Sequence, residues 1–124
     1  MALLELKNLK TFFATKRGTV KAVNGVSYSL DAGKVLGVVG ESGSGKSVSA
    51  MSILRLLDGN GYIDSGEILF NGVDLTKLSM NEMYKIRGNE ISVIFQEPMT
   101  SLNPVFTVSR QISEPLMIHQ GMNK

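Results

Sequence analysis

The sequence feature that most restricts this chain is a glycine-rich octapeptide ending in lysine and serine. It reads Gly40-Glu41-Ser42-Gly43-Ser44-Gly45-Lys46-Ser47 and fits the pattern G-x-x-x-x-G-K-[ST]. A loop that wraps phosphate groups must turn its backbone N–H groups inward, and glycines permit the dihedral angles and the close approach that this requires. The helix after such a loop directs its N-terminus, which carries free N–H groups and a partial positive charge, at the anion. The octapeptide therefore predicts a site for the phosphates of a nucleotide.

Two side chains at the end of the octapeptide have separate expected roles. Lys46 is predicted to reach the β- and γ-phosphates as a point charge, and Ser47 to offer its hydroxyl to Mg²⁺. Val48 is counted with the loop among the nucleotide-binding residues. A chance match is the alternative in a chain with 13 glycines. The context favours phosphate binding, because an apolar run precedes the loop and a helical pattern at 47–57 follows it.

The rest of the chain predicts an α/β fold with an antiparallel section at the front. Apolar and alternating stretches indicate strands at 3–6, 9–14, 20–23 and 26–30, with turns at 16–19 and 31–33. Two short apolar runs, 34–39 and 91–95, are typical of strands buried on both faces, as in a parallel sheet.

Local signals mark further elements. Asn71-Gly72 after an apolar run predicts a hairpin with a type I′ turn. Ser79 followed three residues later by Glu82 is a capping box, which predicts a helix over 80–87. A last helix is expected to start near Thr107, with Pro115 disturbing it.

Composition excludes several classes of function. The length of 124 residues fits one small domain, and the absence of cysteine excludes disulfides, thiolate metal sites and a cysteine nucleophile. The net charge is +2 and the basic residues are scattered, so no nucleic-acid partner is expected. No apolar run approaches the roughly 20 residues that span a bilayer, and the N-terminus is charged too early for a secretory signal. The chain is therefore expected to be soluble, or peripheral to a membrane.

Two segments together resemble a known family. Residues 38–47, which include the phosphate loop, and residues 93–104, which read Val-Ile-Phe-Gln-Glu-Pro-Met-Thr-Ser-Leu-Asn-Pro, resemble an ATP-binding subunit of an ABC transporter. Within that superfamily they are most similar to the ATPase subunits of oligopeptide and dipeptide importers, which also serve as the pattern for nickel importers. The resemblance covers the whole chain and implies the fold of an ABC-type P-loop NTPase, with an antiparallel β section and part of the parallel core sheet with helices.

The resemblance implies roles for two more residues. In the family, a glutamine at the end of a strand contacts the region of Mg²⁺ and the attacking water and couples the ATPase to the membrane subunits; here that is Gln96. Family members also stack an aromatic residue of the first hairpin on the adenine. Phe12 and Phe13 are both candidates, and their position relative to the loop favours Phe13, with Phe12 in the core. The alternative without a functional role is that Gln96 is a polar residue at the end of a strand and that both aromatic residues belong to the core.

The resemblance also implies partners and a location. It implies ATP and Mg²⁺ as cofactors, membrane-spanning permease subunits and a second ATP-binding subunit (in a homo- or heterodimer) as partners, and a place in the cytoplasm on the inner face of the cell membrane. The sequence itself does not separate peptide import from nickel import.

Parts of the family pattern do not occur in this chain. The signature motif Leu-Ser-Gly-Gly-Gln, a second strand ending in Asp-Glu and the later switch histidine are absent, and Glu97 stands where the family commonly has Asp. His119 is expected to be exposed and without a special role. We therefore expect an N-terminal portion of a nucleotide-binding domain that binds nucleotide at most and does not hydrolyse it alone, because phosphoryl transfer needs the full set of groups. Its expected parts are an antiparallel section at 1–33 and 62–75, a phosphate-loop core at 34–58 and 90–97, and the start of a helical section at 98–124.

Two alternatives stay open. The first is an ABC-type ATPase without a transport role, as in DNA repair or translation, for which a basic patch would be expected. The second is an inactive structural or interaction module whose phosphate loop is collapsed and whose sheet edges associate with other copies.

Overall fold

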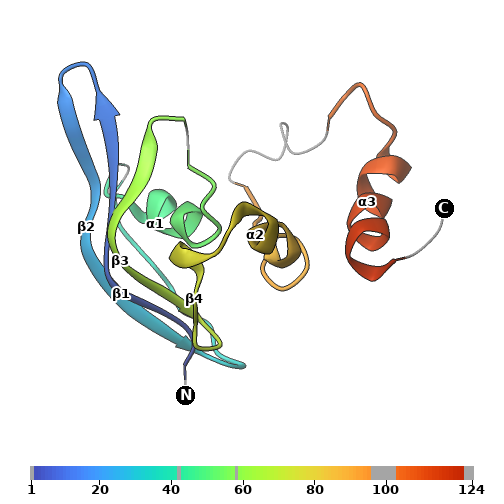
Figure 1. Cartoon of the computed structure of the whole chain (residues 1–124), viewed down its shortest axis with the longest axis horizontal. Helices are drawn as coiled ribbons and strands as arrows, with labels where there is room; N and C mark the ends of the chain where they lie inside the picture. Colours follow the sequence, from blue (N-terminus) through green and yellow to red (C-terminus); the bar gives the residue numbers. More distant parts are fainter. Residues whose placement is uncertain (1, 42, 58, 96–102, 122–124) are drawn as a thin grey trace. The chain divides into compact units, whose positions relative to one another are not determined.

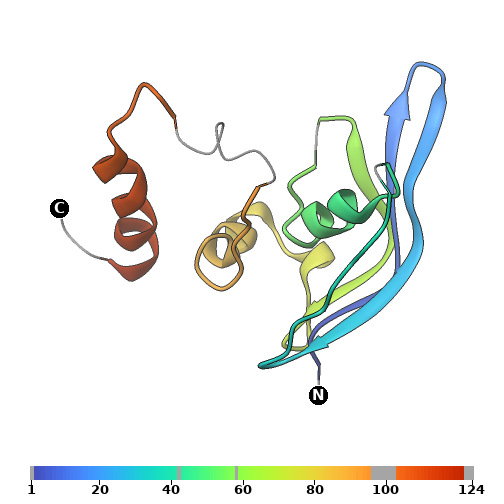
Figure 2. The same ribbon diagram turned by 180° about the vertical axis from the view of Figure 1, so that it is seen from behind.

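The computed structural model describes residues 2–41, 43–57, 59–95 and 103–121, which fall into two compact units, Met1–Leu78 and Ser79–Lys124. The first unit is built on an antiparallel sheet with strand order β2-β1-β3-β4 (Figure 1). Its elements are β1 (Ala2–Thr15), β2 (Gly18–Asp31), α1 (Lys46–Ile53), β3 (Gly61–Phe70), β4 (Val73–Asp74) and the 3₁₀ turn η1 (Leu75–Lys77). Helix α1 lies against one face of the curved sheet, as the views from both sides show (Figures 1 and 2).

Strand β1 is one long, irregular strand where the sequence predicts two. The segments 3–6 and 9–14 are joined through Asn8, which has a φ of 50° and marks a register shift against both neighbouring strands. Glycines face this bulge on both sides. A Cβ on Gly66 of β3 would lie 2.5 Å from the carbonyl oxygen of Asn8, and one on Gly25 of β2 would lie 3.0 Å from its side-chain oxygen. The bulge and the glycines together allow the strands to stay paired while the sheet bends.

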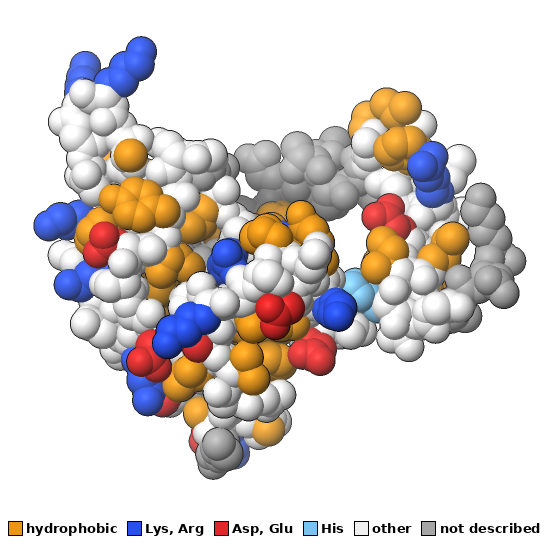
Figure 3. Space-filling view, viewed as in Figure 1, with side chains coloured by type: hydrophobic (Ala, Val, Ile, Leu, Met, Phe, Trp, Pro, Cys, Tyr) orange, Lys and Arg blue, Asp and Glu red, His pale blue; other side chains and the backbone are white. Residues whose placement is uncertain are grey.

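The sheet and α1 enclose a small apolar core. The buried apolar side chains of the first unit come from all three long strands, from the residue after α1 and from η1; they are Leu6, Leu9, Phe12, Val23, Leu54, Ile68 and Leu75. Phe12 is buried as well, and its ring meets that of Tyr62 edge to face at 6.2 Å on the face of β1 opposite Thr11 and Phe13. Lysine, arginine and acidic side chains are interspersed over the face drawn in Figure 3, in keeping with the small net charge.

The two apolar runs expected as core strands are not strands in this structure. Residues 34–39 and 92–95 have no ladder partner among the described residues, and the only parallel pairing found in that part of the chain is the single bridge between Arg87 and Ile91. Val35 is 97% exposed and Ile94 98%. A strand forms only when a neighbouring strand accepts its hydrogen bonds, and the described residues supply none for these runs. The prediction of strands at these positions is therefore wrong for this chain.

The local turn signals are confirmed. Asn71 and Gly72 both have positive φ, 50° and 82°, as a type I′ turn requires, and they join Phe70 to Val73 in an antiparallel pair. The predicted turn at 31–33 is also present, with Gly33 at a φ of 75° and the N–H of Lys34 donating to the carbonyl of Asp31.

The second unit contains α2 (Met80–Ile86) and α3 (Val108–Gln120). The capping box of α2 is present in full, because the Ser79 hydroxyl accepts from the N–H of Glu82 while the Glu82 carboxylate accepts from the N–H of Ser79. Thr107 caps α3 as predicted, but Pro115 lies inside the helix without ending it. Within the part of the chain that the structure describes, no helix is long and apolar enough to cross a membrane.

Candidate functional site

The phosphate loop forms a tight turn that leads directly into α1. The N–H of Ser44 donates to the carbonyl of Glu41 at 3.0 Å, and Gly43 and Gly45 have φ angles of 83° and 93°. A Cβ on Gly40 would lie 2.4 Å from the hydroxyl oxygen of Ser44, so only glycine fits there without a shift of that side chain. Gly45 is the N-cap of α1 and has no side chain to cap it, so the first N–H groups of the helix remain available to a ligand.

Lys46 is the first residue of α1 and folds back over the loop. Its Nζ donates to the carbonyl oxygen of Glu41 at 3.2 Å. The ammonium group therefore lies at the loop that the sequence assigns to phosphate, where an incoming anion would replace a neutral carbonyl as its partner.

Packing against β2 fixes the end of the loop. A Cβ on Gly45 would lie 2.4 Å from the carbonyl oxygen of Ala22 and 3.8 Å from a methyl group of Val23. The neighbouring atom at 2.4 Å belongs to the backbone of a paired strand, so it cannot move aside easily. This close approach holds the start of α1 on the sheet.

The two buried side chains of α1 are polar. They are Ser49 and Ser52, whose hydroxyls donate to the carbonyls of Lys46 and Val48, while the apolar Val48, Met51 and Ile53 are half-buried. Ser52 also shares a 2.8 Å hydrogen bond with the hydroxyl of Thr11 on β1, and both residues are 0% exposed. The sequence alone does not predict this pair, because no local pattern relates residues 41 positions apart.

Ser47 fits the role of a metal ligand through its hydroxyl. The residue is exposed on the first turn of α1, and its hydroxyl makes no hydrogen bond to any residue that the structure describes. The described residues contain no group of three histidine, aspartate or glutamate side chains that could hold a metal ion by themselves. A magnesium ion here would therefore depend on the phosphates of the nucleotide for most of its ligands.

Phe13 lies on the same strand as the buried Thr11, near the end of the segment that follows α1. Its ring is so close to Gly61 that a Cβ there would meet it at 2.7 Å, and the Cβ of Leu57 would lie 3.1 Å from the same position. The side chain is half-buried. Its role in stacking on adenine stays a prediction, as do the other residue assignments of the site. Ser42 and Gln96 lie outside the described residues.

A cavity of about 380 Å³ lies beside the loop in the first unit. Ser44, Gly45 and Lys46 line one part of it, and side chains of β2 that include Val26 and Tyr28 line another. Its volume is in the range of small-molecule sites. Phe13 is not among the lining residues, so the structure brings Ser44, Gly45 and Lys46 together at this cavity without Phe13.

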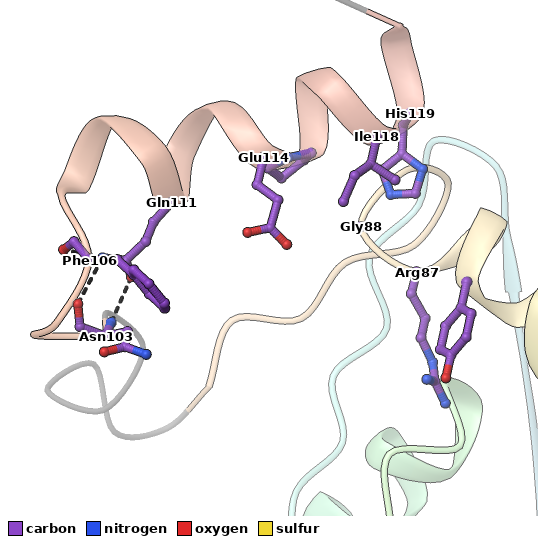
Figure 4. Close-up of a pocket in the computed structure, with 10 residues that line it drawn as sticks. Arg87, Gly88, Asn103, Phe106, Gln111, Glu114, Ile118 and His119 are labelled. Carbon is purple, nitrogen blue, oxygen red and sulfur yellow. Dashed lines mark hydrogen bonds between the residues drawn. The ribbon is translucent and has the colours of Figure 1, made fainter. Parts of the chain in front are cut away.

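A second cavity, of about 600 Å³, belongs to the second unit (Figure 4). It is lined by residues of α2, of the turn after it and of α3, among them Arg87, Glu114 and His119. Gln111 anchors the segment before α3, since its side-chain amide donates to the carbonyl of Asn103 at 2.9 Å and accepts from its N–H at 2.6 Å. His119 is half-buried in this cavity rather than fully exposed, which corrects the expectation from the sequence.

Asp74 is the one described group with a clearly shifted pKa. Burial alone would raise the pKa of Asp74, but the hydroxyl and N–H of Thr76, the N–H of Ile68 and the charge of Lys77 outweigh it, so the pKa lies below its ordinary value. The second carboxylate oxygen is buried and accepts no hydrogen bond from the residues that the structure describes. Asp74 stabilises the turn after β4 and lies outside the phosphate loop.

Comparison with known proteins identifies the family. A family model described as ABC transporter matches residues 23–123. This chain belongs to the ABC transporter family. It is 50% identical to the oligopeptide transport ATP-binding protein AppD of Bacillus subtilis over 98% of this chain and 38% of that protein. It is 52% identical to the dipeptide transport ATP-binding protein DppD of Lactococcus lactis subsp. cremoris over 98% of this chain and 35% of that protein. The resemblance to such ATP-binding proteins is thus confirmed, and the chain spans little more than a third of their length.

Solved structures show the same ABC fold. The dimeric structure of a bacterial ABC transporter cassette matches 93% of this chain and 47% of its own length with a TM-score of 0.76 and 23% identity. A dimeric post-hydrolysis state of an ATP-binding cassette bound to ADP and Pi matches 98% of this chain and 50% of its own length, with a TM-score of 0.79 and 24% identity. The expected fold class is therefore confirmed, although the runs 34–39 and 92–95 are unpaired here.

Proposed function

We propose that this chain binds ATP through the phosphate loop and α1, and that it is part of an ATPase that powers import of peptides or similar small solutes. The observation that supports ATP binding is the loop itself: glycines with positive φ lead into a helix whose first residue, Lys46, holds its ammonium group over the loop. The relatives named as oligopeptide and dipeptide transport ATP-binding proteins support the transport role.

The remaining parts of the proposal follow the same reasoning. Ser47 and Gln96 would contact Mg²⁺, and Phe13 would contact the adenine. Membrane-spanning permease subunits and a second ATP-binding subunit would be the partners, on the inner, cytoplasmic face of the membrane. The chain alone is proposed not to hydrolyse ATP, since the sequence contains neither the signature motif nor the Asp-Glu pair that would polarise the attacking water.

Calorimetric titration of the chain with Mg-ATP tests the binding. We expect measurable heat for the wild type and a loss of affinity of about tenfold or more for Lys46→Ala, because a charge-assisted contact to phosphate is removed. Lys34→Ala is the matched control, since Lys34 is an exposed lysine outside the loop. Equal binding by Lys46→Ala and wild type would contradict the proposed site.

Phosphate release from Mg-ATP tests the second part of the proposal. We expect the chain alone to give no release that depends on Lys46. Turnover at ordinary enzyme rates that disappears in Lys46→Ala would show that this chain suffices for hydrolysis and would contradict the proposal.

A further inference from the structure

Helix α1 is joined to its sheet by a side-chain hydrogen bond between Thr11 and Ser52. Among the described residues, the bond between Thr11 and Ser52 is the only one that joins a side chain of α1 to a strand. The other buried serine, Ser49, bonds within the helix to the carbonyl of Lys46. Gly45 also approaches Ala22 closely, which places the start of the helix on β2.

The direction of this bond is determined by the hydrogens available. The Ser52 hydroxyl has one hydrogen and donates it to the carbonyl of Val48 at 2.7 Å. Thr11 must therefore donate to the Ser52 oxygen, at 2.8 Å. A chain of two hydrogen bonds thus runs from β1 to the first turn of α1, where Val48 follows Ser47, and each bond in such a chain strengthens the other.

The same strand carries the residue proposed to contact the base. Pairing between β1 and β3 is regular at Thr11, Phe12 and Phe13, and the register shift against β2 between Thr11 and Phe13 places the extra residue on β2. Thr11 and Phe13 therefore lie on one face of β1. The Thr11 hydroxyl reaches α1 from that face. Ser52 lies in the last turn of α1, so the bond fixes β1 two residues before Phe13 against the end of the helix whose other end begins at the phosphate loop.

We infer that Thr11 and Ser52 are positioning residues of the nucleotide site, whose hydrogen bond fixes the strand that carries Phe13 relative to the helix that follows the phosphate loop. This inference rests on the proposed function. A nucleotide that contacts Phe13 with its base and the phosphate loop with its phosphates requires a fixed distance between β1 and α1. A bare phosphate chain contacts only the loop and α1, so it does not depend on that distance. Loss of the bond should therefore weaken a nucleotide selectively, because misplaced contacts lose binding energy even when each element is intact.

The test compares ATP with inorganic tripolyphosphate, each with Mg²⁺, by calorimetric titration of the full chain. For Thr11→Val, which keeps the shape and removes the donor, we expect ATP affinity to fall about tenfold, the equivalent of one net hydrogen bond, and tripolyphosphate affinity to stay within about twofold. Thr11→Ser should restore ATP affinity. Thr15→Val is the matched control on the same strand, since its hydroxyl donates to the carbonyl of Gly18 in the hairpin turn instead of to α1.

A second variant keeps the test decisive if Thr11→Val folds poorly. Ser52→Ala should give the same selective loss, and the double variant should lose no more than either single one, since the two side chains act through one bond. Unchanged ATP affinity, or equal losses for both ligands, would overturn the positioning role. If the wild-type chain binds both ligands and the variants show no selective loss of ATP affinity, this inference alone is overturned. If the wild-type chain binds neither ligand, the proposed function is overturned together with this inference.

Discussion

Gly45 is the residue at which backbone shape and packing restrict the sequence together. Its φ of 93° disfavours any other residue, and a Cβ would lie 2.4 Å from the carbonyl oxygen of Ala22. We predict that Gly45→Ala lowers the free energy of unfolding by about 2 kcal/mol or more and abolishes nucleotide binding, because the start of α1 is displaced from β2. Urea unfolding and calorimetric titration measure the two effects.

Gly33→Ala separates the two causes at Gly45. Gly33 also has a positive φ, 75°, but a Cβ there would meet nothing within 4 Å. Gly33→Ala should lower the free energy of unfolding by about 1 kcal/mol through backbone strain alone and leave nucleotide binding intact. Equal effects of the two substitutions on binding would show that the contact with Ala22 does not position the helix.

Because of Asp74, the free energy of unfolding of the first unit should fall at low pH. Because the pKa of Asp74 is lowered in the folded chain, its ionised form contributes stability that is fully present above the ordinary carboxyl pKa of about 3.9 and is lost as the pH falls through the lower folded value. Asp74→Asn keeps an oxygen acceptor for Thr76 and removes the titration. We expect unfolding curves of this variant to change less with pH below about 4 than those of the wild type. The same acid dependence in both chains would contradict the assignment.

At the scale of elements, α2 depends on its cap because it is only 7 residues long. The Ser79 hydroxyl accepts from the N–H of Glu82 at 3.2 Å. Ser79→Ala should cost about 1 kcal/mol of local stability, seen as faster hydrogen exchange at the amides of Glu82 and Met83. Ser92→Ala is the control, since Ser92 is exposed and makes no side-chain hydrogen bond to a residue described here. Unchanged exchange at Glu82 would show that the cap does not hold the helix.

Elements with local signals could be predicted from the sequence, and those set by distant partners could not. The capping box at Ser79 and the turn at Asn71-Gly72 depend on residues within four positions, and both form as predicted. The bulge at Asn8 depends on glycines 17 and 58 positions away, so the pattern at 3–14 gave no warning of it. The run 34–39 has the composition of a buried strand, but composition does not supply a neighbouring strand.

The same distinction applies to the candidate site. The octapeptide at 40–47 predicts its own turn and the helix that follows, because glycines and a helix N-terminus act within one short segment. The hydrogen bond between Thr11 and Ser52 joins two elements, and neither hydroxyl belongs to a motif. In the sequence, a threonine within a predicted strand is explained by the preference of β-branched residues for sheets, so it does not indicate a hydrogen-bond partner.

At the scale of the whole molecule, exposed apolar segments that pair with no strand among the described residues should make the chain self-associate. Val35 and Val39 are 97% and 94% exposed in one run, and Ile94 is 98% exposed in another. Unpaired apolar backbone of this kind pairs readily with another chain. We predict that the mean mass measured by light scattering rises with concentration, and that Val35→Lys combined with Ile94→Lys lowers it.

A matched substitution outside the two runs tests the cause of that association. Val105 is 84% exposed and lies in the segment before α3, so Val105→Lys adds the same charge to an equally apolar position. It should leave the concentration dependence as in the wild type. A monomeric wild-type chain at all concentrations would contradict the prediction.

The serine face of α1 has a consequence for how temperature acts on the molecule. Exposing apolar surface raises the heat capacity, while exposing polar surface lowers it. The buried side chains of α1 itself are Ser49 and Ser52, so detaching this helix exposes polar groups together with apolar core residues, among them the adjoining Leu54. The exposed hydroxyls offset part of the rise in heat capacity, so the free energy of docking α1 should curve less with temperature than that of a helix with a wholly apolar buried face.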